Sequence, residues 1–335
     1  MAFSNQTKFI YLILAIFVFQ VRSRTLIIED AAIVEKHEEW MIHHGRIYHN
    51  SETKEKRFQI FQINRRNIHN FNKASNKTYE LDLNHFADLT NKEFLTTYTG
   101  YRAQEVAQTI NKSTKAPTDY HITDVPESID WRQRGVVTGV KFQGECGSCW
   151  AFSAVAAVEA LIGNGVSLSI QQLLDCTYES NGCRGGTMNS AFRYMAQNQG
   201  ITLESFYPYQ LMQTTCMISN GVIKIGGYED VPPNDEEKLK GFVSMRPVSV
   251  AVDASSDYFR FYSNGIFPAQ DCGNSLNHGV LLVGYGTSVD GIKYWLIKNS
   301  WGTQWGEDGY MRLERDASVY GGACGVAMDP SFPFL

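Results

Sequence analysis

No cysteine precedes position 146, although this chain of 335 residues contains seven. Histidine is scarce in the C-terminal part of the chain, since only one of the eight histidines, His278, lies after residue 125. One histidine and mostly paired cysteines provide too few ligands for a Cys/His zinc site, so we expect neither a metal nor a cofactor. The chain also lacks a basic run, and its net charge of −5 gives no support to nucleic-acid binding.

The chain lacks any apolar run that could comfortably span a membrane. Lys8 precedes an apolar run at residues 9–19, which is too short for a comfortable membrane span and has the layout of a secretory signal. We therefore expect a signal peptide at residues 1–24 and no membrane attachment after its removal. The alternative is an uncleaved anchor, because residues 21–24 lack a clean small-x-small cleavage site. The signal predicts the secretory pathway, ending in a vacuole or lysosome or outside the cell.

The odd number of cysteines points to one special thiol, since six can pair in an oxidising compartment. An alanine-rich apolar run follows Cys149 and stops at Gly163, which predicts a buried helix beginning at or just before Cys149. A thiol at a helix N-terminus faces the positive end of the helix dipole, which favours the thiolate and hence a nucleophile. The Cys146-x-x-Cys149 spacing also fits a thiol–disulfide oxidoreductase, although no βαβ pattern precedes it.

A nucleophilic cysteine needs a base, and His278 is the one imidazole available after residue 125. It stands at the entry to an apolar strand. Asn299 could fix the imidazole ring and its tautomer, because it lies beside Trp301, which would shield the contact. Taken alone, Asn299 fits a turn between two strands equally well.

The later residues predict a helical half followed by a β half, which indicates an α+β protein of two lobes with a cleft between them. Helices are expected at residues 169–176 and 190–197. Strands are expected at residues 248–252, 279–286, 293–298 and 309–313. Before them, polar and apolar residues at steps of three and four over residues 52–72 predict one long helix.

Four separated motifs closely resemble those of the papain-like cysteine peptidases. They are Gln143 followed by Cys149-Trp150-Ala151-Phe152-Ser153, then Asn277-His278-Gly279, Asn299-Ser300-Trp301-Gly302 and Cys183-Arg184-Gly185-Gly186. The resemblance covers residues 125–335 and is strongest to plant members of the family. It implies a papain-like fold with a helical lobe, a β-barrel-like lobe and the active site in the cleft.

The resemblance implies that Cys149 and His278 form a thiolate–imidazolium pair that hydrolyses peptide bonds through a thioester. Asn299 would orient the ring, and the Gln143 side chain with the Cys149 amide would form the oxyanion hole. The implied substrate-binding residues are Gly185, Gly186, Met188, Ala251, Asn277, Gly279 and Trp301. The main pocket is mostly apolar, so we expect an apolar residue two before the scissile bond, unless Asp329 points inward and admits a basic one. A catalytically silent binding homologue is the alternative.

Residues before 125 resemble the family's prodomain, through the helical stripe and the motif Asn84-x-Phe86-x-Asp88. We expect an autoinhibitory prodomain at 25–124 that runs through the cleft, and a peptidase domain at 125–335. Residues 100–124 are polar and are interpreted as a linker. The many histidines suggest that protonation between about pH 7 and 5 loosens the prodomain, with His69 and His85 as the sites to test.

Spacing alone cannot choose among the possible cysteine pairings. The resemblance implies the disulfides Cys146–Cys183, Cys176–Cys216 and Cys272–Cys324. Asn76 and Asn111 stand in glycosylation sequons, which are weak signals. The expected partners are protein or peptide substrates, the chain's own prodomain and cystatin-type inhibitors, and we expect a monomer.

Overall fold

The computed structural model describes residue 11 and residues 31–74, 77–102, 124–198 and 200–335. The described chain divides into two compact units. The first comprises Met1–Asn67 with Ala87–Leu89, and the second comprises Ile68–Phe86 with Thr90–Leu335. The expected signal peptide, most of the expected linker and both sequon asparagines, Asn76 and Asn111, lie outside the described residues.

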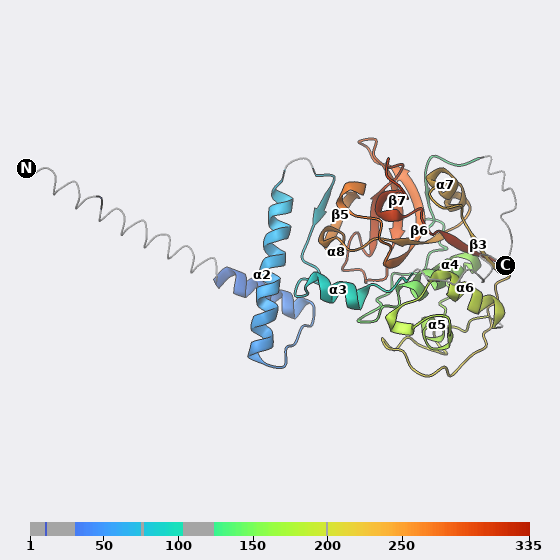
Figure 1. Cartoon of the computed structure of the whole chain (residues 1–335), viewed down its shortest axis with the longest axis horizontal. Coiled ribbons are helices and arrows are strands. Elements are labelled where there is room, and N and C mark those ends of the chain that lie inside the picture. The colour runs from blue at the N-terminus through green and yellow to red at the C-terminus, as the bar shows by residue number, and fades with distance from the viewer. Residues whose placement is uncertain (1–10, 12–30, 75–76, 103–123, 199) are drawn as a thin grey trace, which may run out of the picture. The chain divides into compact units, whose positions relative to one another are not determined.

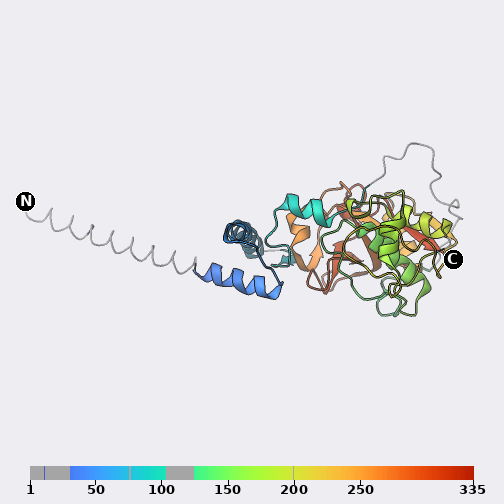
Figure 2. The ribbon, with the colours of Figure 1, turned by 90° about the horizontal axis from the view of Figure 1, so that it is seen from below.

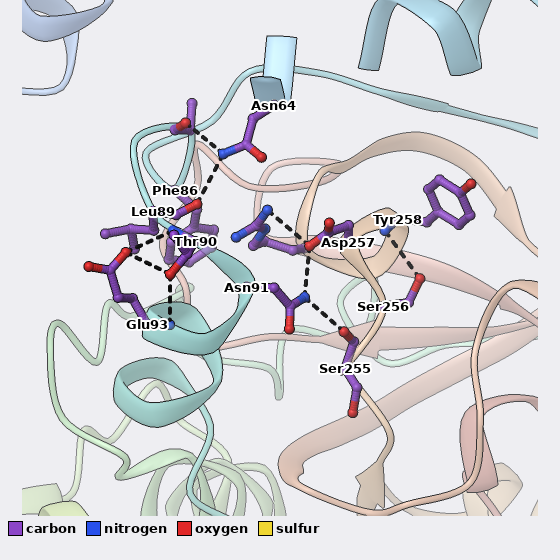
Figure 3. A network of polar contacts seen from close by, with 12 residues as sticks. Asn64, Phe86, Leu89, Thr90, Asn91, Glu93, Ser255, Ser256, Asp257 and Tyr258 are labelled. Carbon is purple, nitrogen blue, oxygen red and sulfur yellow. Dashed lines mark hydrogen bonds and ion pairs between the residues drawn. The ribbon is translucent and has the colours of Figure 1, made fainter. Parts of the chain in front are cut away.

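The first unit contains a helix over residues 31–43 and most of α2 (Ser51–Lys73), which confirms the predicted long helix. The buried carboxylate of Asp88 accepts a hydrogen bond from the Tyr48 hydroxyl at 2.8 Å, and Arg57 donates to its main-chain carbonyl at 2.9 Å. Asn64 donates to the carbonyls of Ala87 and Leu89 at 2.8 and 3.0 Å (Figure 3). The polar stripe of α2 therefore satisfies the backbone of the residue 87–89 loop.

In the second unit, three helices lie together, namely α4 (Cys149–Ile162), α5 (Ile170–Cys176) and α6 (Met188–Gln197) (Figures 1 and 2). Helix α4 ends at Gly163, whose φ of 72° few other residues adopt, so both predicted ends of this helix are confirmed. Helix α6 begins two residues earlier than predicted because Thr187 forms a capping box with Ser190.

Most strands of the second unit lie apart from these three helices, and β5, β6 and β7 are coloured orange to red in Figure 1. The described strands are β1 (Tyr79–Leu81), β2 (Ile129–Asp130), β3 (Gly227–Asp230), β4 (Val248–Val252), β5 (Tyr262–Phe267), β6 (His278–Thr287), β7 (Lys293–Lys298), β8 (Tyr310–Glu314) and β9 (Ser331–Phe334). They form one sheet in the order β1-β5-β8-β7-β6-β4-β9-β3, with β2 also on β6. The described strand order does not close on itself, so the lobe is an open sheet rather than a complete barrel.

The remaining described elements are α3 (Asn91–Tyr98), α7 (Glu236–Met245), α8 (Asp257–Arg260) and the short 3-10 helices Gly182–Arg184, Ala269–Asp271 and Ala323–Gly325. Four fully buried tryptophans anchor the core, namely Trp150, Trp295, Trp301 and Trp305. Among the described residues, no helix is both long and apolar enough to cross a membrane.

Two serines dock helix α4 onto the sheet. Ser153 of α4 donates to the Val280 carbonyl of β6 at 2.7 Å, and Ser249 of β4 donates to the Ser153 carbonyl at 3.1 Å. Because α4 is built largely of alanine and small apolar residues, its backbone can come this close to the strands. The contact fixes the first turn of α4 against the start of β6.

Candidate active site

Cys149 is the first residue of α4, is fully buried and is the free cysteine of the chain. The six other cysteines form the pairs Cys146–Cys183, Cys176–Cys216 and Cys272–Cys324, which are the pairs implied by the resemblance. Because Cys146 is bonded to Cys183 rather than to Cys149, the oxidoreductase interpretation is wrong. Cys146 instead ties the loop before α4 to the residues around Gly185.

His278 begins strand β6, where a cross-strand register places it opposite Val252. Its Nε2 lies 2.8 Å from the Oδ1 of Asn299, and its ring stacks on Trp301 with centroids 4.3 Å apart. Its Nδ1 is buried and makes no hydrogen bond in the described structure. A Cβ on the next residue, Gly279, would lie 3.2 Å from the Cys149 carbonyl oxygen, so a glycine there lets β6 approach the start of α4.

Gln143 is fully buried, and each polar atom of its side chain has a partner. Its Oε1 accepts from the Ser300 hydroxyl at 2.7 Å, which fixes the amide orientation. Its Nε2 donates to the carbonyls of Cys146 at 2.8 Å and Tyr98 at 3.1 Å. The Gln143 carbonyl also accepts from the Tyr209 hydroxyl at 2.7 Å, so the whole residue is held rigidly.

The carbonyl of Tyr98 is available because it lies at the end of helix α3, where the last carbonyls have no partner within the helix. It accepts from Gln143 Nε2 and also from Trp301 Nε1 at 3.2 Å. Helix α3 itself is fixed at its start by a capping box between Thr90 and Glu93. Asn91 adds bonds of 3.0 Å to the Ser255 carbonyl and 2.7 Å to Asp257 (Figure 3).

After α3, the chain continues along the site as an extra strand. Gly186 donates to the Gly100 carbonyl and accepts from the Arg102 amide, both at 2.9 Å, in a parallel bridge. A Cβ on Gly185 would lie 2.5 Å from the Gly100 carbonyl oxygen, so glycine is needed for this approach. The linker interpretation of residues 100–124 is therefore wrong for residues 100–102.

Tyr101 is the side chain that this strand buries, with 3% of its surface exposed. Its hydroxyl donates to the Asp329 carboxylate, and burial together with that carboxylate raises the pKa of Tyr101 above its ordinary range. The sequence left open whether the Asp329 side chain points inward. In the structure, the Oδ2 of Asp329 accepts the hydrogen bond from the Tyr101 hydroxyl.

Burial shifts the pKa values of both Cys149 and His278. Burial raises the pKa of the Cys149 thiol, although backbone N–H groups of Gly279 and Gly100 oppose the rise. Burial lowers the pKa of His278 to about 4, against the opposing effect of its bond to Asn299. Both directions favour a neutral thiol and a neutral imidazole while the site is covered.

The other predicted substrate-binding residues lie around the same strand. Met188 and Ala251 are buried, and a Cβ on Gly279 would lie 3.2 Å from the Met188 sulfur. Asn277 meets this strand through its main chain. Its side chain accepts from the Ala254 amide at 3.0 Å, while its main-chain carbonyl accepts from Gly100 and Tyr101 at 3.1 and 2.9 Å.

Sequence reasoning missed Ser300, Tyr98, Tyr101 and Tyr209 as parts of the site. Ser300 directly follows Asn299 in the quoted motif, so its position was a usable signal. The three tyrosines carry no local pattern, because their roles depend on contacts with residues at least 45 positions away. In the described part of the chain, no group of three or more His, Cys, Asp and Glu could hold a metal ion.

The geometry agrees with comparisons to known proteins. Residues 125–334 match the family described as papain family cysteine protease, and residues 37–94 match the cathepsin propeptide inhibitor domain (I29). The chain is 46% identical over 317 residues to a senescence-specific cysteine protease, SAG39, of Oryza sativa subsp. indica, covering 91% of each chain.

Two solved structures are similar over most of the chain. A recombinant stem bromelain precursor has a TM-score of 0.83 and 42% identity, covering 91% of this chain and 99% of that one. The proform of the ragweed pollen allergen Amb a 11, a cysteine protease, has a TM-score of 0.78 and 39% identity, covering 90% and 94%.

Proposed function

This chain belongs to the papain family of cysteine proteases and carries an I29 propeptide inhibitor domain, and from that premise we propose how its residues cleave peptides. It is a hydrolase with an inhibitory propeptide. The proposal assigns the chemistry to four residues, Cys149, His278, Asn299 and Gln143. It is supported by the hydrogen bond between His278 and Asn299 and by the single free thiol, that of Cys149.

Cys149 is the nucleophile and His278 is its base. Once the site is open to water, the proton of the Cys149 thiol passes to His278, and the sulfur attacks the peptide carbonyl. The imidazolium then protonates the leaving amine, which breaks the C–N bond and leaves a thioester. His278 next removes a proton from water, which hydrolyses the thioester and restores the thiol. Asn299 and the Trp301 ring hold the imidazole in one orientation throughout.

Gln143 stabilises the oxyanion together with the Cys149 amide. Its Nε2 is already aimed at a carbonyl oxygen, that of Tyr98 at 3.1 Å, and Ser300 holds the amide in that orientation. A preorganised donor of this kind is worth roughly 3 kcal/mol in the transition state. In the proenzyme, the Tyr98 carbonyl therefore takes the place where the substrate carbonyl would bind.

The propeptide inhibits in two ways at once. It fills the cleft at Gln143 and Gly186, and its cover favours the neutral forms of Cys149 and His278. Removal of residues 98–102 would restore water to the site and let the thiolate–imidazolium pair form. We propose residues 25–124 as the propeptide and 125–335 as the mature enzyme.

The test is cleavage of a dipeptidyl fluorogenic substrate at pH 5 by the processed chain. We expect turnover that a thiol-reactive epoxide abolishes and that Cys149→Ala lacks. Turnover by Cys149→Ala at the wild-type rate would exclude the assignment. Alkylation of Cys149 by iodoacetamide should also depend on removal of the propeptide.

The main pocket is proposed to accept an apolar or aromatic side chain two before the scissile bond. Tyr101 supports this, because its buried ring reaches Asp329 from the strand paired with Gly186. We expect tyrosine and basic residues to gain from Asp329, and Asp329→Ala to remove that gain while leaving leucine substrates unaffected. Specificity constants for substrates with Leu, Tyr and Arg at this position measure the effect.

The remaining expectations concern the cell. We propose that residues 1–24 direct the chain into the secretory pathway, towards a vacuole or lysosome or the outside of the cell. Its partners would be peptide substrates and cystatin-type inhibitors, and the enzyme would act as a monomer. Microscopy of a C-terminally tagged chain and sedimentation of the processed enzyme test these points.

A further inference from the structure

Phe142 directly precedes Gln143, and 46% of its surface is exposed although the propeptide is in place. Its backbone is rigid, because Phe142 forms an antiparallel bridge with Trp301. The neighbouring bonds, from Gln143 N to Ser300 O at 2.9 Å and from Gly302 N to Lys141 O at 3.1 Å, complete this short ladder. An exposed aromatic ring is thus fixed one residue from the proposed oxyanion donor.

The propeptide residues show on which side of the scissile bond this ring lies. Tyr101 occupies the side of Gly186 and Asp329, and the Tyr98 carbonyl sits at Gln143. Moving further back along the propeptide, Phe94 and Phe86 pack edge-on against Trp301 at 5.2 and 5.4 Å between ring centroids. Phe142 and Trp301 therefore lie beyond Gln143, on the side of the amine that leaves.

One propeptide ring already contacts Phe142. The imidazole of His85 packs edge-on against it, with centroids 5.3 Å apart and an interplanar angle of 86°. This is a favourable aromatic geometry. When the propeptide is removed, the Phe142 ring loses this neighbour and faces solvent together with Trp301.

We propose that Phe142 is a specificity-determining residue that selects aromatic side chains in the first two residues after the scissile bond. The inference rests on the proposed function, because it assumes that Cys149 forms the acyl-enzyme. His85 acts as the intramolecular stand-in for the aromatic side chain of the leaving peptide.

Partitioning of the acyl-enzyme between amines and water tests the proposal. A peptide methyl ester acylates Cys149 and releases methanol, which carries no side chain into the Phe142 site. An added amine then attacks the thioester carbonyl, the C–S bond breaks, and the amine proton passes through His278 to the sulfur. Glycinamide, leucinamide, phenylalaninamide and glycyl-phenylalaninamide serve as amines for the enzyme obtained by processing of the full chain, with active sites titrated.

We expect the wild-type enzyme to prefer phenylalaninamide or glycyl-phenylalaninamide over leucinamide. Phe142→Leu should reduce that preference by about three- to tenfold, in line with an aromatic pair contact. Phe206→Leu is the matched control, since this phenylalanine is 67% exposed and is expected to leave the preference unchanged. An equal preference in wild type and Phe142→Leu would overturn the inference.

A failure of the proposed function gives a different result, because no acyl-enzyme would then form from the methyl ester. Binding of glycyl-phenylalaninamide to the processed enzyme, measured by calorimetry, still decides the inference in that case. Weaker binding to Phe142→Leu than to Phe206→Leu supports it, and equal binding excludes it.

Discussion

Two buried histidines in separate regions of the molecule have similar surroundings. His37, in the first unit, stacks on Trp40 at 5.9 Å with an interplanar angle of 11°, and His278, in the second, stacks on Trp301 at 4.3 Å and 25°. Burial lowers the pKa of both. Each also has one buried ring nitrogen without a hydrogen-bond partner, Nε2 in His37 and Nδ1 in His278.

The difference lies in what else holds each ring. His278 has a polar partner in Asn299, and the residue before it, Asn277, is bonded to the strand at residues 100–102, which we propose is removed by processing. His37 is enclosed by aromatic side chains of its own unit, Trp40, Tyr48, Phe58 and Phe61. Burial of an imidazole therefore serves two purposes here. In the proposed function, burial keeps the imidazole of His278 neutral until the propeptide is released, whereas at His37 we expect burial to make the fold sensitive to acid.

The largest expected effect separates the two histidines by activity. His278→Ala should lower kcat/KM of the processed enzyme by about 10⁴-fold, because the base and the proton donor are both lost. His37→Gln should leave this constant unchanged, since His37 belongs to the propeptide. Fluorogenic peptide assays after processing in trans measure both variants. Comparable losses of kcat/KM in His278→Ala and His37→Gln would show that the two histidines do not differ in their importance for catalysis.

The hydrogen bond to Asn299 distinguishes His278 from His37. Asn299→Ala should reduce kcat/KM by about 10²-fold, because the imidazole keeps its chemistry but loses its fixed orientation. Exposed Asn198 provides the matched control, and Asn198→Ala should retain wild-type turnover. A wild-type rate in Asn299→Ala would mean that stacking on Trp301 alone is sufficient.

The strand at residues 100–102, which contains Tyr101, predicts a smaller effect. Tyr101→Phe deletes the bond to Asp329 and should speed self-processing of the full chain by about tenfold, as expected for a hydrogen bond to a charged group. In the Cys149→Ala proenzyme, Tyr101→Ala should raise the pKa of His278 from about 4 towards its ordinary value, because water enters the site. Imidazole NMR titration measures this shift. The pKa of His37 should not respond.

The smallest expected effect concerns acid activation. The depressed pKa of His37 contributes stability that is fully present above pH 6.5 and is lost as pH falls through the folded-state pKa. Glu38, Asp88 and Glu55 favour its protonation and Lys54 opposes it, but burial outweighs them. His37→Gln should therefore move the pH midpoint of self-processing about 0.5 unit towards acid.

An unchanged midpoint in His37→Gln would exclude this role. The sequence directed attention to His69 and His85 instead. His69 is exposed, so it keeps its contact with water, and His85 is buried against Phe142. His69→Gln is thus the matched control and should leave the midpoint in place.

Much of the fold followed from local patterns. Helix α4 has its predicted ends, and β4 and β7 have their predicted bounds, because a terminal glycine and runs of β-branched or aromatic residues act over a few positions. The short strands β1, β3 and β9 gave no signal, since three or four residues are too few for a periodicity to emerge. Their pairing partners lie far away in sequence, as with Tyr79 opposite Gly265.

The sequence by itself determined the kind of chemistry, because Cys149, His278, Asn299 and Gln143 stand in motifs whose residue types allow few other uses. Only the tertiary structure decided that a helix-end carbonyl, that of Tyr98, accepts a hydrogen bond from Gln143 and that Tyr101 reaches Asp329. It also decided the environments of His37 and Phe142. Most of these contacts join residues distant in sequence, and packing chooses among such pairs by shape and burial, which no local pattern records.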